Sequence, residues 1–454
     1  MIAMTSPLPP LDLVLTGATL LTADPRQPLI ENAVVGVSDG RFVLLEPASR
    51  GKPLPQARRI VDLDGRVITP GLVNIHTHAI LTMVRGVAED LGFAPAYTPG
   101  IPQGHMVTPE EAYAISRLGA LEAMLFGSTL INDTFVHADI ITPAMAEVGL
   151  RVWSCGRIHD VDFSGVSTGR WEHKDSIGDQ TLQAALDLAQ RYQGKSNGRI
   201  GVQLAAHAPD TCSTAFLKRI GEAARANGLR VTTHLSQSKV ELARIRDRDG
   251  MSPPELLEEV GLLTDTLLAA HCIHVSDSDI SRIGRAGINV ANIAKGNATG
   301  ATIAPTSRLR DAGAHLTLGT DNMHADMVEL MRWSLAVGRI QQGSVTEDWQ
   351  PSTVFQMATM GGARAMGLQD EIGSIEIGKR ADLVVFDFRR PHLTPNINPL
   401  GNIVHVAQGR DVEMVVVDGD IVVEDGRPTK VDAESIRREA DAAIRSLWER
   451  VRGG

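Results

Sequence analysis

Short apolar runs with turn residues between them characterise both ends of the chain. Gly40 and the pair Asp64-Gly65 separate the first group of runs, as the turns of antiparallel hairpins do. A second group near the carboxyl end has the same texture, with Asp418-Gly419 as a further hairpin turn. We therefore expect the two ends to build one small β-sandwich from the runs at 11–16, 33–38, 42–45, 59–61, 381–386, 413–417 and 421–423.

Between these ends, strand-like runs alternate with stretches of helical spacing, which is typical of a parallel sheet or barrel. The clearest unit is a predicted helix over 214–226, which ends at Asn227-Gly228 and precedes a predicted strand over 229–233. Two further short strands are predicted over 266–270 and 315–319. A long, charged helix, predicted over 432–451, should pack on the outside with its charges in solvent.

Another helix is predicted to begin after Thr108, because threonine is a good N-cap and Pro109 fits the first helical position. Gly119 lies inside this helix and should weaken it slightly, since glycine has a low helix propensity. The expected apolar face consists of four residues at helical spacing, namely Ala114, Leu118, Leu121 and Leu125.

Composition excludes several classes of protein. The chain has 454 residues, of which 43% are hydrophobic, and its net charge of −10 argues against a nucleic-acid partner, which would need clustered Lys and Arg. Cys155, Cys212 and Cys272 are too few and too scattered for a disulfide framework. We find neither a secretion signal nor an apolar stretch long enough to span a membrane. A cytoplasmic protein without a membrane partner is expected.

Two histidines stand at the end of an apolar run that begins at residue 68. His76 and His78 are separated by one residue, and residues i and i+2 of a β-strand point to the same side of the sheet. Two imidazoles in this arrangement can chelate one metal ion. The plain alternative is a pair of histidines on a solvated strand face.

More such residues follow other predicted strands. His234 ends the strand over 229–233, His271 ends the strand over 266–270, and Asp321 closely follows the strand over 315–319. In a (β/α)₈ barrel the carboxyl ends of the strands form the rim where catalytic residues converge. A single histidine at a strand end is usually structural, but five ligand-type residues at matching ends are hard to explain by coincidence. The pattern indicates a metal-dependent active site.

Five stretches carry a resemblance to the amidohydrolase superfamily, namely PGLVNIHTH, TTHLSQS, AAHCIHVSD, LGTDN and GSIEIGKRADLVVFD. The chain is similar to its single-metal members, which are related to cytosine, guanine and adenosylhomocysteine deaminases and to triazine chlorohydrolases. The resemblance covers nearly the whole chain. It implies an α/β fold with a (β/α)₈ TIM-type barrel over 70–370. The β-sandwich would be formed jointly by 1–69 and 371–454, with a terminal helix in the second segment.

The resemblance implies that His76, His78, His234 and Asp321 hold one divalent metal ion. It places His271 within hydrogen-bond reach of a metal-bound water. The carboxylate of Asp321 could then accept the proton of this water as attack begins. Three neutral imidazoles and one carboxylate suit Zn²⁺ first, with Fe²⁺, Mn²⁺ and Co²⁺ as alternatives. Because no carboxylated lysine is suggested at a matching strand end, a single metal ion is expected.

The resemblance also places further residues near the substrate. Arg85 and His207 are expected in the pocket, although a surface charge and a core histidine are the alternative interpretations. Asn322 and His324, just after the metal-binding Asp321, could line the same pocket. Cys272 has no CxxC partner, so a packing role is favoured over a nucleophilic one.

One position departs from the pattern of the related deaminases. They carry a Glu three residues after the third metal histidine, where it passes a proton to a ring nitrogen, but this chain has Gln237 there. A carboxamide forms hydrogen bonds but does not exchange protons near neutral pH. We therefore favour a metal-activated water attacking an amide, urea or carbamate carbon. Deamination or dechlorination of a purine, pyrimidine or triazine is the alternative.

A non-catalytic scaffold is a second alternative, because the usual proton shuttle is missing. The complete set of five ligand-type residues argues against it, since a protein without catalysis has no evident need for them. A small-molecule substrate is expected, and homo-oligomerisation is predicted as well.

Overall fold

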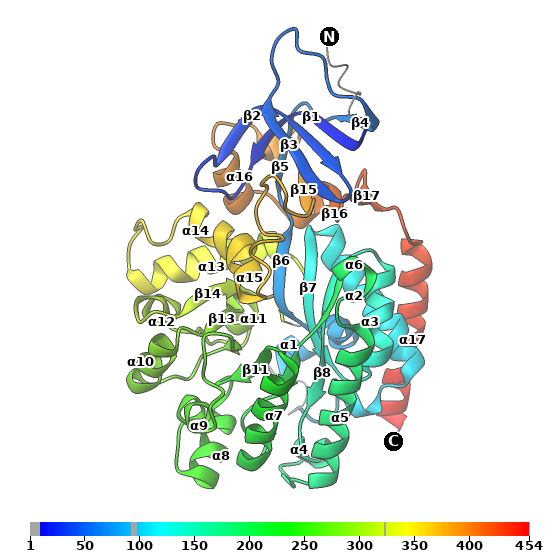
Figure 1. Ribbon diagram of the computed structural model, residues 1–454. Coiled ribbons are helices and arrows are strands. Elements are labelled where there is room, and N and C mark those ends of the chain that lie inside the picture. Colours follow the sequence, from blue (N-terminus) through cyan, green and yellow to red (C-terminus); the bar gives the residue numbers. More distant parts are fainter. Residues whose placement is uncertain (1–9, 92–97, 322–323, 454) are drawn as a thin grey trace.

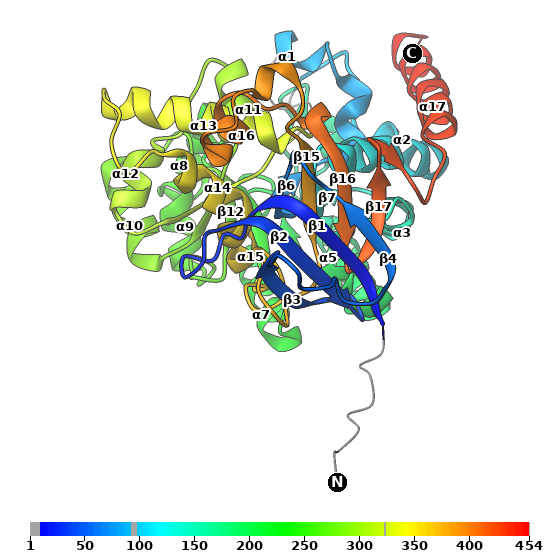
Figure 2. The same ribbon diagram turned by 90° about the horizontal axis from the view of Figure 1, so that it is seen from above.

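The computed structural model describes residues 10–91, 98–321 and 324–453. A barrel domain carries a β-rich domain at one end, and the carboxyl-terminal helix α17 (Ala433–Gly453) lies along the side of the barrel (Figure 1). Seen from above, the β-rich domain covers part of the barrel and α17 stands at its edge beside α2 (Pro109–Leu125) (Figure 2). Arg450 of α17 forms an ion pair with the buried Glu111 of α2.

The barrel is a ring of parallel strands. Its order follows the sequence, and β9 and β10 together fill the position between β8 and β11. The ring closes where Thr77 bridges Asp321, and Asp321 N–H donates to the carbonyl oxygen of His76 at 2.9 Å. The predicted (β/α)₈ barrel is thereby confirmed. Its strands are β6 (Leu72–Thr77), β7 (Ser128–Phe135), β8 (Arg151–Ile158), β9 (Ile200–Val202), β10 (Leu204–Ala206), β11 (Val231–Leu235), β12 (Leu268–His271), β13 (Asn289–Asn292) and β14 (His315–Leu318).

Helices cover the outside of this ring (Figure 1). The predicted helix of the clearest unit begins after the N-cap Ser213 and ends at Gly228, which takes the left-handed conformation that glycine allows. The main helices of the layer are α2, α3 (Ala138–Glu147), α5 (Asp175–Tyr192), α7 (Thr214–Asn227), α8 (Lys239–Asp249), α9 (Pro253–Glu259), α10 (Asp277–Ala286), α12 (Thr306–Asp311), α13 (Met327–Gln342) and α14 (Pro351–Gln356).

Helix α2 begins as predicted, because the Thr108 side chain accepts from Glu111 N–H and Glu111 in turn caps Thr108. Of its predicted apolar face, Leu121 is buried, and Leu118 and Leu125 are half-buried and pack against the core. The apolar residues of α2 that are fully buried in addition are Ala112, Ile115, Ala120, Ala123 and Met124.

Gly119 marks a close contact between α2 and a neighbouring segment. A Cβ atom at this position would lie 2.1 Å from the carbonyl oxygen of Ala79, the residue that directly follows His78. The glycine therefore lets α2 approach the segment η1 (Ala79–Val84) closely. Gly119, which the sequence suggested as a weak point of the helix, is required for this close packing.

The two ends of the chain build the β-rich domain. Strand β5 pairs antiparallel with β15, which joins the amino-terminal and carboxyl-terminal strands into one sheet around its own apolar core. The predicted joint domain is confirmed. Its strands are β1 (Leu11–Leu21), β2 (Leu29–Ser38), β3 (Arg41–Pro47), β4 (Ala57–Asp62), β5 (Arg66–Pro70), β15 (Leu383–Asp387), β16 (Val412–Val417), β17 (Asp420–Glu424) and β18 (Arg427–Pro428).

The turns at Gly40 and Asp418-Gly419 connect antiparallel neighbours, as predicted. The hairpin predicted at Asp64-Gly65 is wrong. Strands β4 and β5 on either side of this turn both pair in parallel with the long strand β1, one along Leu11–Thr16 and the other at Thr19–Leu20. Because β1 is long enough to pair with each of them in turn, they do not pair with one another. Within the described part of the chain, no helix is long and apolar enough to cross a membrane.

Candidate metal centre

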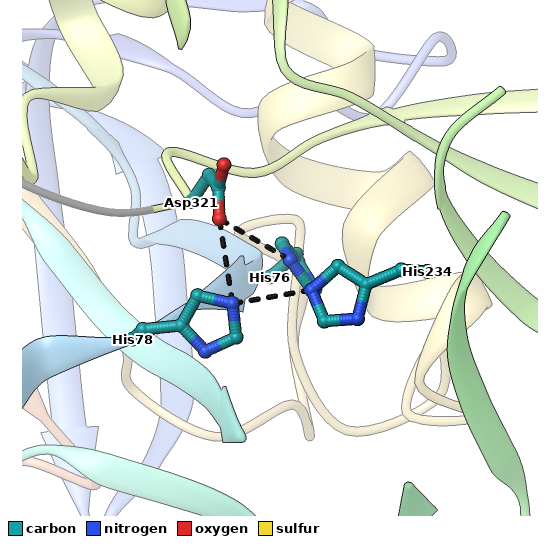
Figure 3. Close-up of side chains that lie close together, drawn as sticks. All are labelled: His76, His78, His234 and Asp321. Atoms are coloured by element: carbon teal, nitrogen blue, oxygen red, sulfur yellow. Dashed lines mark hydrogen bonds and ion pairs between the residues drawn. The ribbon is translucent and has the colours of Figure 1, made fainter. Parts of the chain in front are cut away.

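Four of the predicted ligands meet at the carboxyl end of the barrel strands. His76 and His78 lie at the end of β6, His234 lies on β11, and Asp321 follows β14. Their nearest ligand atoms all lie within 4.8 Å of one another, and all four residues are buried. Asp321 Oδ1 is 3.5 Å from His76 Nε2 and 3.4 Å from His78 Nε2, while His78 Nε2 and His234 Nε2 are 3.3 Å apart (Figure 3). The atoms converge as donors around one ion would.

Backbone carbonyl groups orient two of these imidazoles. His78 Nδ1 lies 2.5 Å from the carbonyl oxygen of Thr134, and His234 Nδ1 lies 2.6 Å from that of His207. A neutral imidazole that donates its Nδ1 proton to a carbonyl keeps the lone pair of Nε2 for another partner. Both rings therefore present Nε2 as an electron-pair donor to the centre, which is the arrangement of metal-ligating histidines.

Electrostatics keep the histidines neutral. Burial lowers the pKa of His76 well below its ordinary value, and burial together with His76 lowers the pKa of His78 to about 3. Burial also lowers the pKa of His234. Among the described residues, the ring nitrogens of His76 and Asp321 Oδ2 have no hydrogen-bond partner, although buried polar groups almost always have one. Neutral donors with unused lone pairs around one point fit a divalent metal ion.

A comparison with known proteins gives the family. The model of the amidohydrolase family matches residues 67–422 of this chain. The chain belongs to the amidohydrolase family. It is accordingly a hydrolase of C–N bonds, and the predicted superfamily is confirmed.

Curated relatives match almost the whole of this amidohydrolase. A 5-methylthioadenosine/S-adenosylhomocysteine deaminase of Desulforudis audaxviator is 37% identical over 92% of this chain and 95% of its own length. A 5'-deoxyadenosine deaminase of Methanosarcina barkeri is 31% identical over 97% of this chain and 99% of its own length.

Solved structures agree with the fold. A crystal structure of an adenosine deaminase from Xanthomonas campestris with bound zinc is 25% identical, with a TM-score of 0.84 over 98% of this chain and 100% of that chain. The zinc complex of an atrazine chlorohydrolase from Arthrobacter aurescens has a TM-score of 0.83 at 21% identity, over 95% of this chain and 100% of that chain. The second likeness concerns the fold alone.

His271 of the amidohydrolase stands beside the four ligands. Its Nε2 is 4.0 Å from Asp321 Oδ2, and its Nδ1 is 3.0 Å from Oδ1 of Asn297 on α11 (Ala294–Thr299). Burial lowers the pKa of His271 to about 3. His271 and Asp321 have positive φ angles of 74° and 66°, a backbone conformation that residues other than glycine rarely adopt. Such strain concentrates at functional sites.

Residues not singled out from the sequence support the ligands. Asn74 donates to Thr320 Oγ1 at 2.8 Å and accepts from Thr320 N–H at 3.1 Å, which ties β6 to the segment before Asp321. Asp133 of β7 accepts from Ala79 N–H at 2.6 Å, and burial raises the pKa of Asp133 to about 7. The polar pair Asn132-Asp133 inside a buried strand was the signal available in the sequence.

Gln237 lies in the loop between β11 and α8, three residues after His234. Its backbone N–H donates to Glu241 Oε2 at 2.8 Å, and the N–H of Ser236 donates to Glu241 Oε1 at 2.7 Å. Glu241 is buried, and burial together with Asp210 raises its pKa well above the ordinary value. Glu241 thus fixes the backbone from which Gln237 extends, a role that the sequence did not reveal.

The predicted substrate residues lie at different places. The His207 ring centre is 5.0 Å from that of His234, and His207 Nδ1 is 2.9 Å from Thr211 Oγ1. His324 is partly buried, and burial with the neighbouring Lys295 lowers its pKa to about 4. Arg85 follows η1 and pairs with Glu122 of α2. Asn322 lies outside the described residues.

An aromatic group near the centre also escaped the sequence analysis. The Phe135 ring centre is 6.2 Å from that of His78, and the Phe163 ring centre is 5.2 Å from that of His207. The guanidinium carbon of Arg157 lies 5.5 Å from the first phenylalanine ring and 4.3 Å from the second.

Proposed function

We propose that this amidohydrolase cleaves an amide-, urea- or carbamate-type C–N bond of a small molecule with the help of one divalent metal ion. His76, His78, His234 and Asp321 would hold the ion, for which Zn²⁺ is the first choice because three neutral imidazoles and one carboxylate suit it. Fe²⁺, Mn²⁺ and Co²⁺ are the alternatives. When bound, such an ion lowers the pKa of a coordinated water toward neutrality and polarises a carbonyl group.

Two residues are suited to handle protons. Asp321 Oδ2, 4.0 Å from His271 Nε2, is a carboxylate oxygen that can accept the proton of the attacking water. His271 is neutral at pH 7 and is oriented by Asn297, so its Nε2 lone pair can accept a hydrogen bond from the same water. Asp321 can afterwards pass its proton to the nitrogen that leaves.

Gln237 is the single observation that carries the choice of an acyclic carbonyl substrate. Attack on a carbonyl carbon requires no protonation of a ring nitrogen, so the reaction does not need a carboxyl group at this position. The side chain of Gln237 can instead donate a hydrogen bond to the carbonyl oxygen or accept one from the leaving N–H group. The loop held by Glu241 supports a fixed position for it.

Deamination of an amino-heterocycle is the second candidate, and the curated relatives favour it. Several are deaminases of adenosine derivatives that match more than nine tenths of this chain. This reaction would need another proton carrier in place of Gln237, for which His207 and His324 are the candidates. Dechlorination of such a ring would also need another proton carrier. A non-catalytic scaffold, the remaining alternative, has no support in this family membership.

The test uses protein loaded separately with Zn²⁺, Fe²⁺, Mn²⁺ or Co²⁺ and a set of matched ureas, carbamates, amides and amino-heterocycles. We expect one ion per chain by elemental analysis and faster release of ammonia or amine from the acyclic substrates. In a Gln237→Glu variant, a negative charge near the substrate carbonyl should slow acyclic hydrolysis. If the unchanged protein deaminates an amino-heterocycle faster than it cleaves every acyclic bond, the second candidate is correct.

A cytoplasmic location and a homo-oligomeric state complete the proposal. Both stay predictions, and size-exclusion chromatography with light scattering would measure the second of them.

A further inference from the structure

The first loop of the barrel runs from β6 to α2 and lies beside the candidate metal centre. It leaves β6 directly after His78 as the segment η1, and it returns to α2 through the segment η3 (Gly104–Met106). Of this loop the structure describes 79–91 and 98–108. In a (β/α)₈ barrel the loops that follow the strands form the mouth of the active site. The position of this loop therefore contributes to the shape of the mouth next to His78.

Both η1 and η3 lie close to His78. Ala79 N–H donates to Asp133 at 2.6 Å, so η1 starts from a fixed point beside the proposed ligand. A Cβ atom at Gly104 of η3 would lie 3.3 Å from Cε1 of Phe135, and the Phe135 ring centre is 6.2 Å from that of His78. Segment η3 therefore packs against the phenylalanine that contacts His78.

The carboxyl-terminal helix α17 binds both segments. Trp448 Nε1 donates to the carbonyl oxygen of Met83 in η1 at 2.8 Å. Arg450 Nη2 donates to the carbonyl oxygen of Met106 in η3 at 3.1 Å. Leu447, which precedes the tryptophan, is fully buried in the main apolar core and anchors this part of the helix. One turn of α17 is thus hydrogen-bonded to the loop at two points.

Arg450 also binds the place where the loop enters α2, the helix beside which α17 stands (Figure 2). Its Nη1 and Nη2 lie 2.6 Å from Oε1 and 2.8 Å from Oε2 of the buried Glu111. Glu111 Oε2 in turn accepts from Thr108 N–H at 3.0 Å and so caps the start of α2. Because a guanidinium group is a rigid plane, it ties the carbonyl group of Met106 to the first turn of α2.

The proposed metal ligands have anchors that do not involve α17. Thr77 Oγ1 donates to the carbonyl oxygen of Asp321 at 3.0 Å, and His78 Nδ1 donates to the carbonyl oxygen of Thr134. Strands β6 and β7 pair with each other in the barrel wall. Loss of the contacts of α17 should therefore move the loop and leave the metal ligands in place.

We propose that α17 holds the first loop of the barrel in the conformation that binds substrate, with Trp448 and Arg450 as positioning residues for the reaction. Each of them acts through a backbone carbonyl group of the loop and not on the reacting atoms. Short 3₁₀ segments such as η1 and η3 have few hydrogen bonds of their own, so donors from α17 fix their position. The inference goes beyond the proposed function, because it applies whichever C–N bond is cleaved.

The test follows amide hydrogen exchange by mass spectrometry in protein with added Zn²⁺. Trp448→Phe removes the N–H donor and keeps an aromatic ring, and Arg450→Met removes the donors and keeps an apolar stem. In the double variant, peptides that cover 79–87 and 104–108 should exchange about 10-fold faster, as for the loss of a hydrogen bond that closes a local structure. Peptides of β6 and β7 should exchange at an unchanged rate.

The single variants keep the test decisive if the double variant folds poorly. Trp448→Phe should speed exchange mainly in 79–87 and Arg450→Met mainly in 104–108, while Arg450→Lys keeps a cationic donor and should restore part of the protection. The matched control is Arg445→Met, which removes an exposed ion pair with Asp441 within α17 and should leave both peptides unchanged.

Two results overturn the proposal. Unchanged exchange of 79–87 and 104–108 in the double variant would show that the loop does not depend on α17. Equal acceleration of the loop and of strands β6 and β7 would show that α17 adds only to overall stability.

Kinetics separate this inference from the proposed function. On the amide, urea, carbamate or amino-heterocycle that the unchanged protein turns over fastest, the KM of the double variant should rise about 5- to 30-fold, as for the loss of one or two hydrogen bonds, with unchanged metal content. If this substrate is an amino-heterocycle but KM depends on α17, the positioning role stands and the assigned reaction fails. If the loop exchanges faster while kcat and KM stay the same, the positioning role fails.

Discussion

Two buried polar clusters occupy opposite ends of the barrel. At the amino ends of the strands, Arg151 begins β8 and forms ion pairs with Asp382 at 2.6 Å and with Asp418 at 3.0 Å. Asp418 is bound in addition by Arg199 and Arg380. We call these five residues the junction network, because it joins the barrel to the β-rich domain. The metal centre lies at the carboxyl ends of the same strands.

The two clusters differ in how many of their polar atoms have a hydrogen-bond or ion-pair partner. In the junction network each carboxylate has at least two partners, and Asp382 Oδ1 also accepts from Asp418 N–H at 2.8 Å. Arg151 and Arg380 hold the pKa of Asp418 below its ordinary value, although burial alone would raise it. In the candidate metal centre, by contrast, neither ring nitrogen of His76 has a hydrogen-bond partner among the described residues. A cluster whose polar atoms all have partners is suited to a structural role. A cluster with unused donors and acceptors is suited to binding a ligand.

The largest effect is expected from an Arg151→Leu substitution. It leaves Asp382 buried without its main cation and should lower the free energy of unfolding by about 3–5 kcal/mol. Denaturant titration measures the loss, and the metal content of the folded fraction should not change. As a control, Arg445→Leu removes an exposed i,i+4 pair with Asp441 and should cost less than about 0.5 kcal/mol. Equal losses in both variants would contradict a special role of the network.

A smaller effect, on function and not on folding, is expected from His234→Ala. The remaining three donors form an incomplete site, so metal affinity should fall by more than about 100-fold, beyond the loss typical of outer-sphere residues. Competition with a chromophoric chelator measures the affinity. His271→Ala is the matched comparison, since it should keep the metal and lose activity. Loss of metal from His271→Ala would make His271 a ligand.

A still smaller effect is expected from Asn297→Ala, because Asn297 orients the His271 ring through a 3.0 Å hydrogen bond. We expect kcat to fall by about 10- to 100-fold with unchanged metal content, as for other partners that orient active-site histidines. Asn297→Asp keeps an acceptor oxygen in place and should retain more of the activity. Equal activity of the two variants would show that the acceptor is not what matters.

The smallest effect, when it is expressed per unit of pH, is the pH dependence of stability. In the metal-free protein the pKa of His78 is lowered to about 3, whereas an unfolded histidine titrates near 6.5. The unfolded state then binds more protons between these values, so the protein should lose stability as the pH falls from about 6.5 to about 3. One histidine contributes at most about 1.4 kcal/mol per pH unit. After removal of metal by a chelator, the His78→Leu variant should lose less free energy of unfolding per pH unit than the unchanged protein. An identical slope in both proteins would contradict the lowered pKa of His78.

The sequence predicted those parts of the molecule that depend on regular spacing. The i,i+2 pair His76 and His78 lies at one strand end and converges with His234 and Asp321, because parallel strands in a barrel share a rim. The joint β-rich domain could also be predicted, from its turn residues. Both predictions rest on local patterns that the fold repeats.

The rest depends on contacts between distant segments. Asn297 looks like an ordinary residue of a short helix, and only its neighbour His271 gives it a role. The close approach of Gly119 to Ala79 was missed for the same reason, because helical spacing alone does not show which segment α2 packs against. Asp64-Gly65 is a turn as predicted, but the length of β1 decides what the adjoining strands pair with.

The bridge between Thr77 and Asp321 has a consequence for the folding of a newly synthesised chain. These residues are 244 positions apart, and they close the ring between its first and last strands. The same closure brings Asp321 to His76 and His78, so a ribosome-bound chain that still lacks β14 has an open ring and an incomplete set of donors. Metal binding by His76, His78, His234 and Asp321 together would therefore require the completed barrel.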